Sequence, residues 1–228
     1  MKSIVYNLNN AVDAIRQDGW ISFLKSQAHE MLGFPCERYF IYEHTIKERN
    51  PDDFKTSLQD FEEFIIRDKI EIVELESRGY KFGSRKISNK IALANGVIVH
   101  CVFVQKELAH IGRVGLTKKA KKYVDGLLFR VNFKQNEAVT GGTWTNPKFR
   151  GKGLMKYGYY QRFEFLRYLG IKTSRNAVDI TNKASNKVHA KFEPKILSTA
   201  RYRPILYFFK YWKETPVNTN QLKAPEKC

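Results

Sequence analysis

The chain has 228 residues, of which 43% are hydrophobic and 14% aromatic, so it can bury one sizeable core, and a single main domain is favoured over two independent ones. Its formal net charge of +17 favours a partner that carries phosphate or carboxylate groups: nucleic acid, an anionic membrane surface, an acidic carrier protein or a nucleotide. The sequence has no apolar run near the about 20 residues of a membrane-spanning helix, and its first residues become polar too early for a signal peptide, which predicts a soluble, cytoplasmic protein.

The first residues of the chain have a helical pattern. Residues 10–32 carry apolar side chains at roughly helical spacing, which predicts an amphipathic helical extension over residues 1–36. Such an extension either packs against its own domain or docks as a peripheral helix on a membrane surface or a partner.

The next stretch is predicted to form a strand and then a helix. The aromatic and β-branched run 38–44 is typical of a strand. Asn50-Pro51-Asp52-Asp53 then predicts a helix start, because Asp side chains accept hydrogen bonds from free backbone N–H groups and Pro fits the first turn. Apolar residues at helical spacing extend this helix toward residue 78, although residues 70–75 also suit a strand.

The middle of the chain suggests a hairpin. The apolar runs 91–94 and 97–104 flank Asn95-Gly96, and Asn-Gly readily adopts the positive φ angles of a type I′ turn. Two antiparallel strands are therefore predicted here. The runs 127–133 and 138–145 also have strand character.

The last part of the chain alternates helices and strands. Its pattern predicts helices over 153–169 and 183–192 and a strand over 177–180 between them. Two final strands are predicted at 196–200 and 205–212. The fold class is therefore mixed, α+β. The main domain is placed at 37–214, and the composition from 215 to 228 predicts a loose tail.

The cysteines give no sign of a disulfide framework or a metal site. Cys36, Cys101 and Cys228 are an odd number, and no two of them stand at the spacing of metal ligands. We expect free thiols in a reducing compartment and no bound metal.

The segment with the clearest chemistry is Thr145-Asn146-Pro147-Lys148-Phe149-Arg150-Gly151-Lys152-Gly153-Leu154, which joins a predicted strand to a predicted helix. Its two glycines allow a tight turn, and the N–H groups at a helix start carry partial positive charge. This arrangement suits a pyrophosphate, and the three basic side chains of the segment add positive charge. It matches neither the P-loop nor the dinucleotide-binding pattern in full.

This segment resembles motif A of the GNAT superfamily of N-acetyltransferases, Gln/Arg-x-x-Gly-x-Gly/Ala, with Lys148 at the first position. In that family the loop holds the pyrophosphate of coenzyme A, and the preceding strand runs beside the pantetheine arm. The resemblance implies a phosphate cradle at Arg150, Gly151, Lys152, Gly153 and Leu154. It also implies pantetheine contacts at Gly142, Thr143, Trp144 and Thr145.

A second segment, residues 182–192, resembles motif B of the same family, Asn-x-x-Ser/Ala followed by a helix, with Asn182 and Ser185 at the two motif positions. Glu193-Pro194 stands where the family usually has Gly-Phe. The resemblance covers residues 137–192. It implies a mostly antiparallel, centrally splayed sheet flanked by helices, with acetyl-CoA or another acyl-CoA as co-substrate.

The resemblance also implies candidate catalytic residues. His189 stands seven residues after Asn182, where many family members have a Tyr that acts as general acid, and a histidine can donate a proton near neutral pH. Glu137 stands thirteen residues before Arg150, where histone-type members carry a catalytic base. A buried, packed His189 and an inert Glu137 with a water relay are the alternatives, and Glu43 and Glu193 are weaker candidate bases.

The expected function is transfer of an acetyl or longer acyl group to a primary amine, such as an amino sugar or another small molecule. An alternative is N-acyl amino acid or acyl-homoserine lactone synthesis with an acidic acyl carrier protein as donor. From another class, the charge would suit a nucleic-acid-binding module, but the sequence has no helix-turn-helix, zinc-finger or RNA-binding signature. Nucleic acid is therefore not the expected partner.

Overall fold

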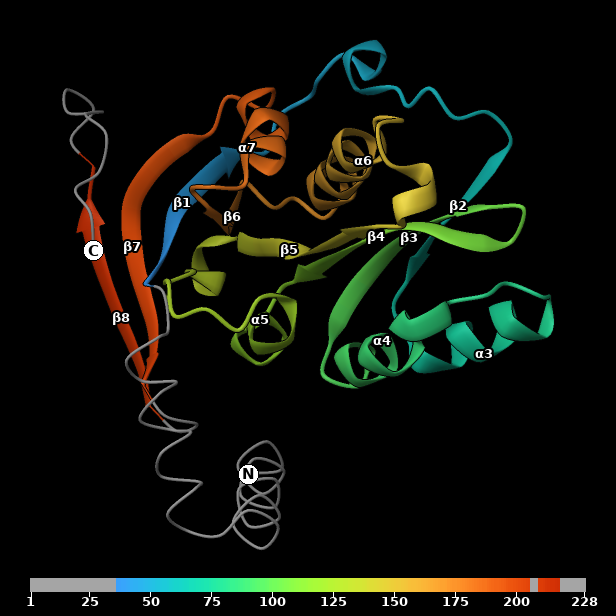
Figure 1. Ribbon diagram of the computed structural model, residues 1–228, viewed down its shortest axis with the longest axis horizontal. Helices are drawn as coiled ribbons and strands as arrows, with labels where there is room; N and C mark the ends of the chain where they lie inside the picture. Colours follow the sequence, from blue (N-terminus) through green and yellow to red (C-terminus); the bar gives the residue numbers. More distant parts are fainter. Residues whose placement is uncertain (1–35, 206–208, 218–228) are drawn as a thin grey trace, which may run out of the picture. The chain divides into compact units, whose positions relative to one another are not determined.

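A computed structural model of the chain describes residues 36–205 and 209–217 (Figure 1). The predicted extension over 1–36 and the predicted loose tail over 215–228 fall almost entirely outside the described residues, although the last strand continues to Pro216. The chain divides into two compact units, Ile41–Leu197 and the combination of Met1–Phe40 with Ser198–Cys228. None of the helices that the structure describes is both long and apolar enough to cross a membrane.

The larger unit is a mixed α+β structure, as the sequence predicted. Its strands are β1 (Glu37–Thr45, from Ile41 on), β2 (Phe61–Ile66), β3 (Val97–Val104), β4 (Glu107–Gly115), β5 (Glu137–Thr145), β6 (Thr173–Asp179) and the first residues of β7 (Lys195–Ile205). Its helices are α3 (Lys69–Ser77), α4 (Lys86–Leu93), α5 (Lys118–Val124), α6 (Leu154–Tyr168) and α7 (Lys183–Ala190). Short 3-10 turns lie at η1 (Pro51–Phe54), η2 (Gly83–Arg85), η3 (Phe133–Gln135) and η4 (Pro147–Phe149).

Six strands of this unit lie in the order β2-β3-β4-β5-β6-β1. The pairs β2–β3, β3–β4 and β4–β5 are antiparallel, and β5–β6 is parallel. Helices α6 and α7 lie on one side of the sheet, and α3, α4 and α5 lie on the other (Figure 1). Because both faces are covered, β3 is buried along nearly its whole length and reads as a continuous apolar run.

The prediction of a hairpin around Asn95-Gly96 is wrong. Residues 91–93 are the last turn of α4, and Gly96, with φ of 79°, ends that helix. The side-chain amide of Asn95 donates to the carbonyl of Ile91 at 2.7 Å, and the N–H of Gly96 donates to the carbonyl of Leu93 at 2.9 Å. Asn-Gly suits a helix C-terminus as well as a hairpin, because both require positive φ. The real hairpin joins β3 to β4.

The single helix predicted from residue 50 to residue 78 is also wrong. Asn50 caps only the short turn η1, accepting from the N–H of Asp52 at 3.1 Å. Residues 61–66 then form β2. Pairing with β3 satisfies the backbone N–H and C=O groups of this segment, and the apolar spacing along the chain does not reveal that partner. A helix follows only at α3. The predicted strand at 127–133 is absent, and the chain there is irregular up to η3.

The core on the α6 side contains Phe54, Val114, Ala138, Tyr159, Phe163, Leu166 and Phe192. Each fully buried Phe contributes about 2–3 kcal/mol through removal of apolar surface from water. The tight approach of α6 to β4 depends on Gly158, since a Cβ there would lie 2.4 Å from Nε2 of His110. This close packing fixes the position of the α6 N-terminus relative to β5.

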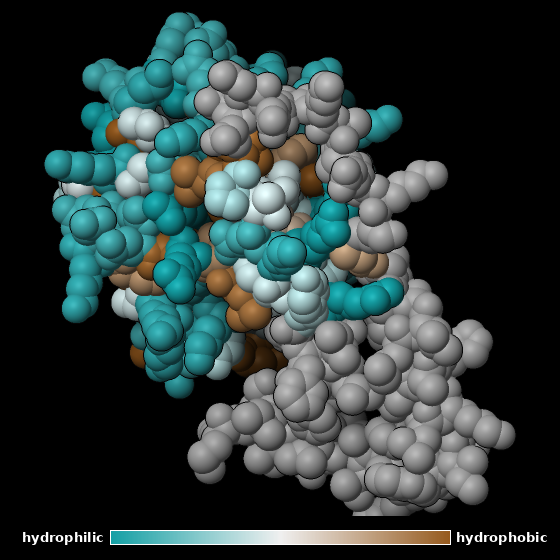
Figure 2. Space-filling view, turned by 90° about the vertical axis from the view of Figure 1, so that its left-hand side faces the viewer, coloured by the Kyte–Doolittle hydropathy of each residue, from teal (hydrophilic) through white to brown (hydrophobic). Residues whose placement is uncertain are grey.

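In the smaller unit, Ser198–Ile205 of β7 pairs antiparallel with β8 (Phe209–Pro216). The rings of Tyr39 and Trp212 lie 6.2 Å apart, and the indole N–H of Trp212 donates to Glu214 at 2.8 Å. The two strands predicted at 196–200 and 205–212 are thus present, the first one longer and the second one shifted to Phe209–Pro216. The face drawn in Figure 2 is mainly hydrophilic, with hydrophobic residues gathered in a smaller area, in line with the large net charge.

Candidate functional site

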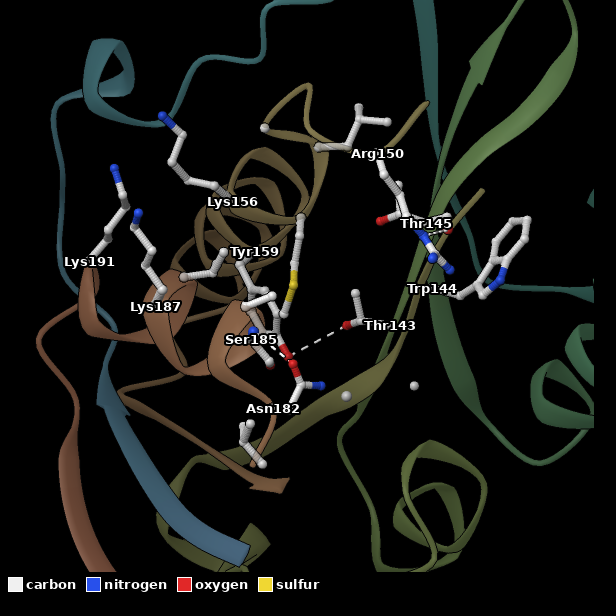
Figure 3. A pocket seen from close by; sticks show the side chains of 18 of the residues that line it. Thr143, Trp144, Thr145, Arg150, Lys156, Tyr159, Asn182, Ser185, Lys187 and Lys191 are labelled. Atoms are coloured by element: carbon white, nitrogen blue, oxygen red, sulfur yellow. Dashed lines mark hydrogen bonds between the residues drawn. The ribbon is translucent and has the colours of Figure 1, made fainter. Parts of the chain in front are cut away.

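The candidate site lies where β5 and β6 separate. The two strands pair only from Glu137↔Thr173 to Val139↔Arg175. Beyond this point β5 continues along β4 as far as His110↔Thr145, without β6 as a neighbour. A cavity of about 970 Å³ opens at this separation, with walls from β5, the loop after it, the first turns of α6, the end of β6, and α7 (Figure 3). The sheet is therefore splayed at its centre, as expected.

The structure brings most of the predicted cofactor-binding residues together around this cavity. Its lining includes Gly142, Thr143, Trp144, Thr145, Arg150, Gly151, Gly153, Leu154, Asn182 and Ser185. Lys152 is the exception. Its side chain is exposed, and its carbonyl accepts from Thr56 Oγ1 at 2.6 Å and from the N–H of Ser57 at 3.0 Å. Contact of these residues with a cofactor stays a prediction.

The loop between β5 and α6 has the backbone form that its glycines suggest. Gly151 and Gly153 have φ of 77° and 79°, which L side chains rarely adopt. Gly153 is the N-cap of α6, and its carbonyl accepts from the N–H of Tyr157 at 3.0 Å. The N–H groups of residues 154–156, between Gly153 and Tyr157, precede the first helical hydrogen bond and carry partial positive charge. The loop therefore offers an anion-binding backbone.

Three lysines on the cavity wall were missed by the sequence predictions. Lys156 comes from α6, Lys187 from α7, and Lys191 from the residue after α7, and their side chains lie on the same side of the cavity (Figure 3). Burial, followed by the charge of Lys191, lowers the pKa of Lys156. The spacing of four residues between Lys187 and Lys191, which places them on one helix face, was the available signal.

The cavity is positively charged. Within the described ranges, no carboxylate lies at ion-pair distance from Lys156, Lys187 or Lys191. Arg150 adds a further cation, and its Nε donates to the carbonyl of Thr145 at 3.3 Å, which ties the loop to the end of β5. Asp179 is the acidic lining residue, and its carboxylate accepts from Thr181. The wall therefore suits a ligand with several negative charges.

Tyr159 is a fourth residue of the cavity wall that the sequence interpretation did not select. It lines the cavity, and its hydroxyl oxygen accepts hydrogen bonds from Thr143 Oγ1 at 3.5 Å and Asn176 Nδ2 at 3.4 Å. Because both contacts use the oxygen as acceptor, its own proton is not committed to them. The guanidinium of the buried Arg162 lies 4.0 Å from the centre of the Tyr159 ring, a cation–π contact that orients the side chain.

His189, the predicted general acid, is fully buried and is not among the residues that line the cavity. Its Nδ1 lies 3.1 Å from His44 Nε2, its Nε2 lies 3.0 Å from Asn176 Nδ2, and its ring packs 4.5 Å from that of Tyr159. Burial, then the charges of His44 and Arg162, lower its pKa well below the usual value. His189 is therefore a neutral imidazole at neutral pH. Its catalytic role stays a prediction.

Glu137, the predicted base, lies at the start of β5 and does not line the cavity. Its carboxylate accepts from Arg175 Nη2 at 2.8 Å and from the backbone N–H of Asn132. The weaker candidate Glu43 pairs with the same arginine at 2.9 Å. The other one, Glu193, is exposed and pairs with Lys47 at 3.0 Å. Each of these acids is occupied by an ion pair, and their catalytic role stays a prediction.

No family model matches the sequence, and neither does any curated protein. Solved structures similar to the chain include a GNAT-family acetyltransferase from Colwellia psychrerythraea (13% identity over 72% of this chain and 55% of that one, TM-score 0.46). A second is the glucosamine N-acetyltransferase region of a fungal multi-domain β-N-acetylglucosaminidase (13% identity over 79% of this chain and 22% of that one, TM-score 0.47). A third is a tandem GNAT protein of clavulanic acid biosynthesis (11% identity over 82% of this chain and 55% of that one, TM-score 0.48). The chain spans less than two thirds of each. Two further similar structures are also named GNAT-family or GCN5-related acetyltransferases.

Proposed function

We propose that this protein is a GNAT-type N-acyltransferase that moves an acetyl or longer acyl group from an acyl-CoA to a primary amine. The observation that carries the proposal is the meeting of two sequence motifs at one cavity. Arg150, Gly151 and Gly153 come from the first motif, and Asn182 and Ser185 from the second, and all of them line the space between the separated strands β5 and β6.

The cavity offers what a coenzyme A thioester requires. The loop amides from Gly151 to Lys156 would hold the pyrophosphate, and Lys187 and Lys191 supply positive charge for the phosphates. The part of β5 from Gly142 to Thr145 lacks β6 as a neighbour, so backbone groups there remain for an extended pantetheine arm. Coenzyme A supplies the activated acyl group as a thioester.

In the proposed reaction, the neutral amine attacks the thioester carbonyl, a C–N bond forms and the C–S bond breaks. The nitrogen loses a proton to solvent, and the departing thiolate requires one. Tyr159 is placed to give that proton, because its hydroxyl lies on the cavity wall with its hydrogen uncommitted. Solvent then restores the proton to Tyr159. The buried His189 acts through Tyr159, by packing against its ring.

Isothermal titration calorimetry with acetyl-CoA tests the binding step. We expect micromolar affinity, and the same affinity for coenzyme A without the acyl group, because the phosphates supply most of the contacts. Thiol release in the presence of a panel of primary amines tests the transfer, and longer acyl-CoA thioesters and an acyl carrier protein define the donor. Absence of acetyl-CoA binding combined with tight, salt-sensitive DNA binding would overturn the proposal.

A further inference from the structure

The two faces of β5 carry different chemistry. The hydroxyls of Thr143 and Thr145 point to the α6 side, where they contact Arg162 at 3.2 Å and His110 at 2.9 Å. The intervening residue, Trp144, also lines the cavity, but its ring contacts the guanidinium of Arg85 at the start of α4. The cavity wall is therefore backed by α4 on its second face.

Arg85 is a cation without an anionic partner. Its guanidinium carbon lies 4.9 Å from the centre of the Trp144 ring. Its Nε is buried without a hydrogen-bond partner. Among the described residues, no carboxylate lies at ion-pair distance from this side chain. The stacking on Trp144 orients the guanidinium but leaves its charge unneutralised.

A second such arginine stands beside the first. Arg113 of β4 donates through Nη2 to Ser88 Oγ at 3.2 Å and to Asn89 Oδ1 at 2.8 Å, and the Ser88 hydroxyl donates to the carbonyl of Arg85 at 3.1 Å. Burial, followed by the charge of Arg85, lowers the pKa of Arg113. Its Cδ would lie 2.8 Å from a Cβ at Gly142, so it presses directly on the cavity strand.

This cluster has more hydrogen-bond donors than acceptors. The Nε atoms of Arg85 and Arg113 and the Nδ2 atom of Asn89 are all buried donors without partners. The acid on this face, Asp125, pairs through Oδ1 with Lys121 at 3.3 Å and accepts there from the N–H of Leu127, and its Oδ2 has no hydrogen-bond partner. Two neighbouring like charges and unpaired donors raise the energy of the free protein, and an anion bound between them would lower it.

We infer that Arg85 and Arg113 form a subsite for an anionic group, a carboxylate or a phosphate, on the acceptor, so that the acceptor is an amine that also carries negative charge. The inference rests on the proposed acyltransferase function. Trp144 lines the cavity on one side and contacts Arg85 on the other, so the anionic group lies next to the wall along which the thioester is held. Arg85 makes the contact, and Arg113 adds charge from a fixed position.

Matched acceptor pairs test this subsite. Glycine against glycinamide tests a carboxylate, and aminoethyl phosphate against ethanolamine tests a phosphate, with each rate expressed per neutral amine because the amine pKa differs within each pair. We expect kcat/KM to be at least about tenfold higher for the anionic member of one pair, as a charge-assisted hydrogen bond implies. Arg85→Gln should remove this preference, and Arg85→Lys should restore part of it, because it keeps the charge and loses the planar fork. Lys86→Gln is the matched control, since Lys86 pairs with Glu76 instead.

A binding measurement keeps the test independent of turnover. Because Arg85 stacks on Trp144, an anionic acceptor should change the Trp144 fluorescence of the whole chain, and a Trp144→Phe variant identifies that signal. Equal rates and equal fluorescence for both members of both pairs, or an unchanged preference in Arg85→Gln, would overturn the subsite. Normal acetyl-CoA binding and amine-dependent thiol release in the same samples would show that the subsite alone has failed. Loss of acetyl-CoA binding in the wild-type protein means that the proposed function itself has failed.

Discussion

The two faces of β5 are built in different ways. On the α6 face, the proposed donor site depends on backbone: two glycines with positive φ, the free amides of a helix start and a strand without its neighbour. On the α4 face, the proposed acceptor subsite depends on side chains, Arg85, Arg113 and Trp144, from three separate elements. A backbone site leaves a compact sequence motif, whereas a side-chain site assembled from distant positions leaves none.

The largest expected effect concerns the proton donor on the α6 face. Tyr159→Phe should lower kcat about a hundredfold, since it removes the hydroxyl proton needed by the thiolate, with acetyl-CoA affinity unchanged. Steady-state kinetics combined with calorimetry measures both quantities. His189→Gln should lower kcat less, because His189 does not line the cavity. The reverse order of the two variants would show that His189 is the general acid after all.

A loss of cofactor binding at Gly151 can be distinguished from the backbone strain that any side chain causes at positive φ. Gly151 and Gly170 have φ of 77° and 72°, and neither has an atom within 4 Å of an added Cβ. Valine at either position should cost about 1–2 kcal/mol of the free energy of unfolding. Gly151→Val alone should also weaken acetyl-CoA binding about thirtyfold, roughly 2 kcal/mol, because Gly151 lines the cavity. Equal affinity in the two variants would remove Gly151 from the site.

The four buried histidines, His44, His100, His110 and His189, should make stability depend on pH. Burial lowers the pKa of His44 to about 3, and it also lowers those of His100, His110 and His189. Below pH 6.5 the unfolded chain binds protons at these histidines while the folded chain does not, so acid favours unfolding. The free energy of unfolding should fall below pH 6.5 by about 1.4 kcal/mol per pH unit for each such histidine, and for His44 this fall continues to about pH 3.

Urea titrations between pH 8 and pH 5 measure this slope. The curve should be flat above pH 7 and should decline below 6.5, before the carboxylates begin to titrate. A stability that is constant down to pH 5 would mean that these histidines are protonated in the folded protein.

The smallest expected effect concerns the lysines of the cavity. Lys187→Gln and Lys191→Gln should each weaken acetyl-CoA binding up to about fivefold at low salt, as partly exposed charges do. Lys183→Gln on the same helix is the control, because Lys183 does not line the cavity. The wild-type affinity should fall with added salt, and the double variant should fall less steeply. An equal salt dependence in the wild-type protein and the double variant would mean that backbone N–H groups alone bind the phosphates.

Part of the fold could be read from local signals. The order β5, loop, α6, β6, α7 was predicted from the sequence, because glycines with positive φ and the Asn182 cap act within a few residues. The segments 50–68 and 91–96 were assigned wrongly, whereas the strand predicted at 97–104 is β3 and the end of the predicted helix is α3. The apolar spacing of the two segments fits both the helical period and the strand period. Only the pairing of β2 with β3 and of β3 with β4 decides where strands form.

The candidate site divides in the same way. The sequence by itself determined the backbone form of the proposed phosphate cradle, because positive φ at its glycines and free amides at a helix start are local requirements. Only the tertiary structure decided that Tyr159 faces the cavity while His189 is buried behind it, and that Arg85 and Arg113 share one face of β5. Burial and charge are properties of neighbours in space, which the spacing of residues along the chain does not specify.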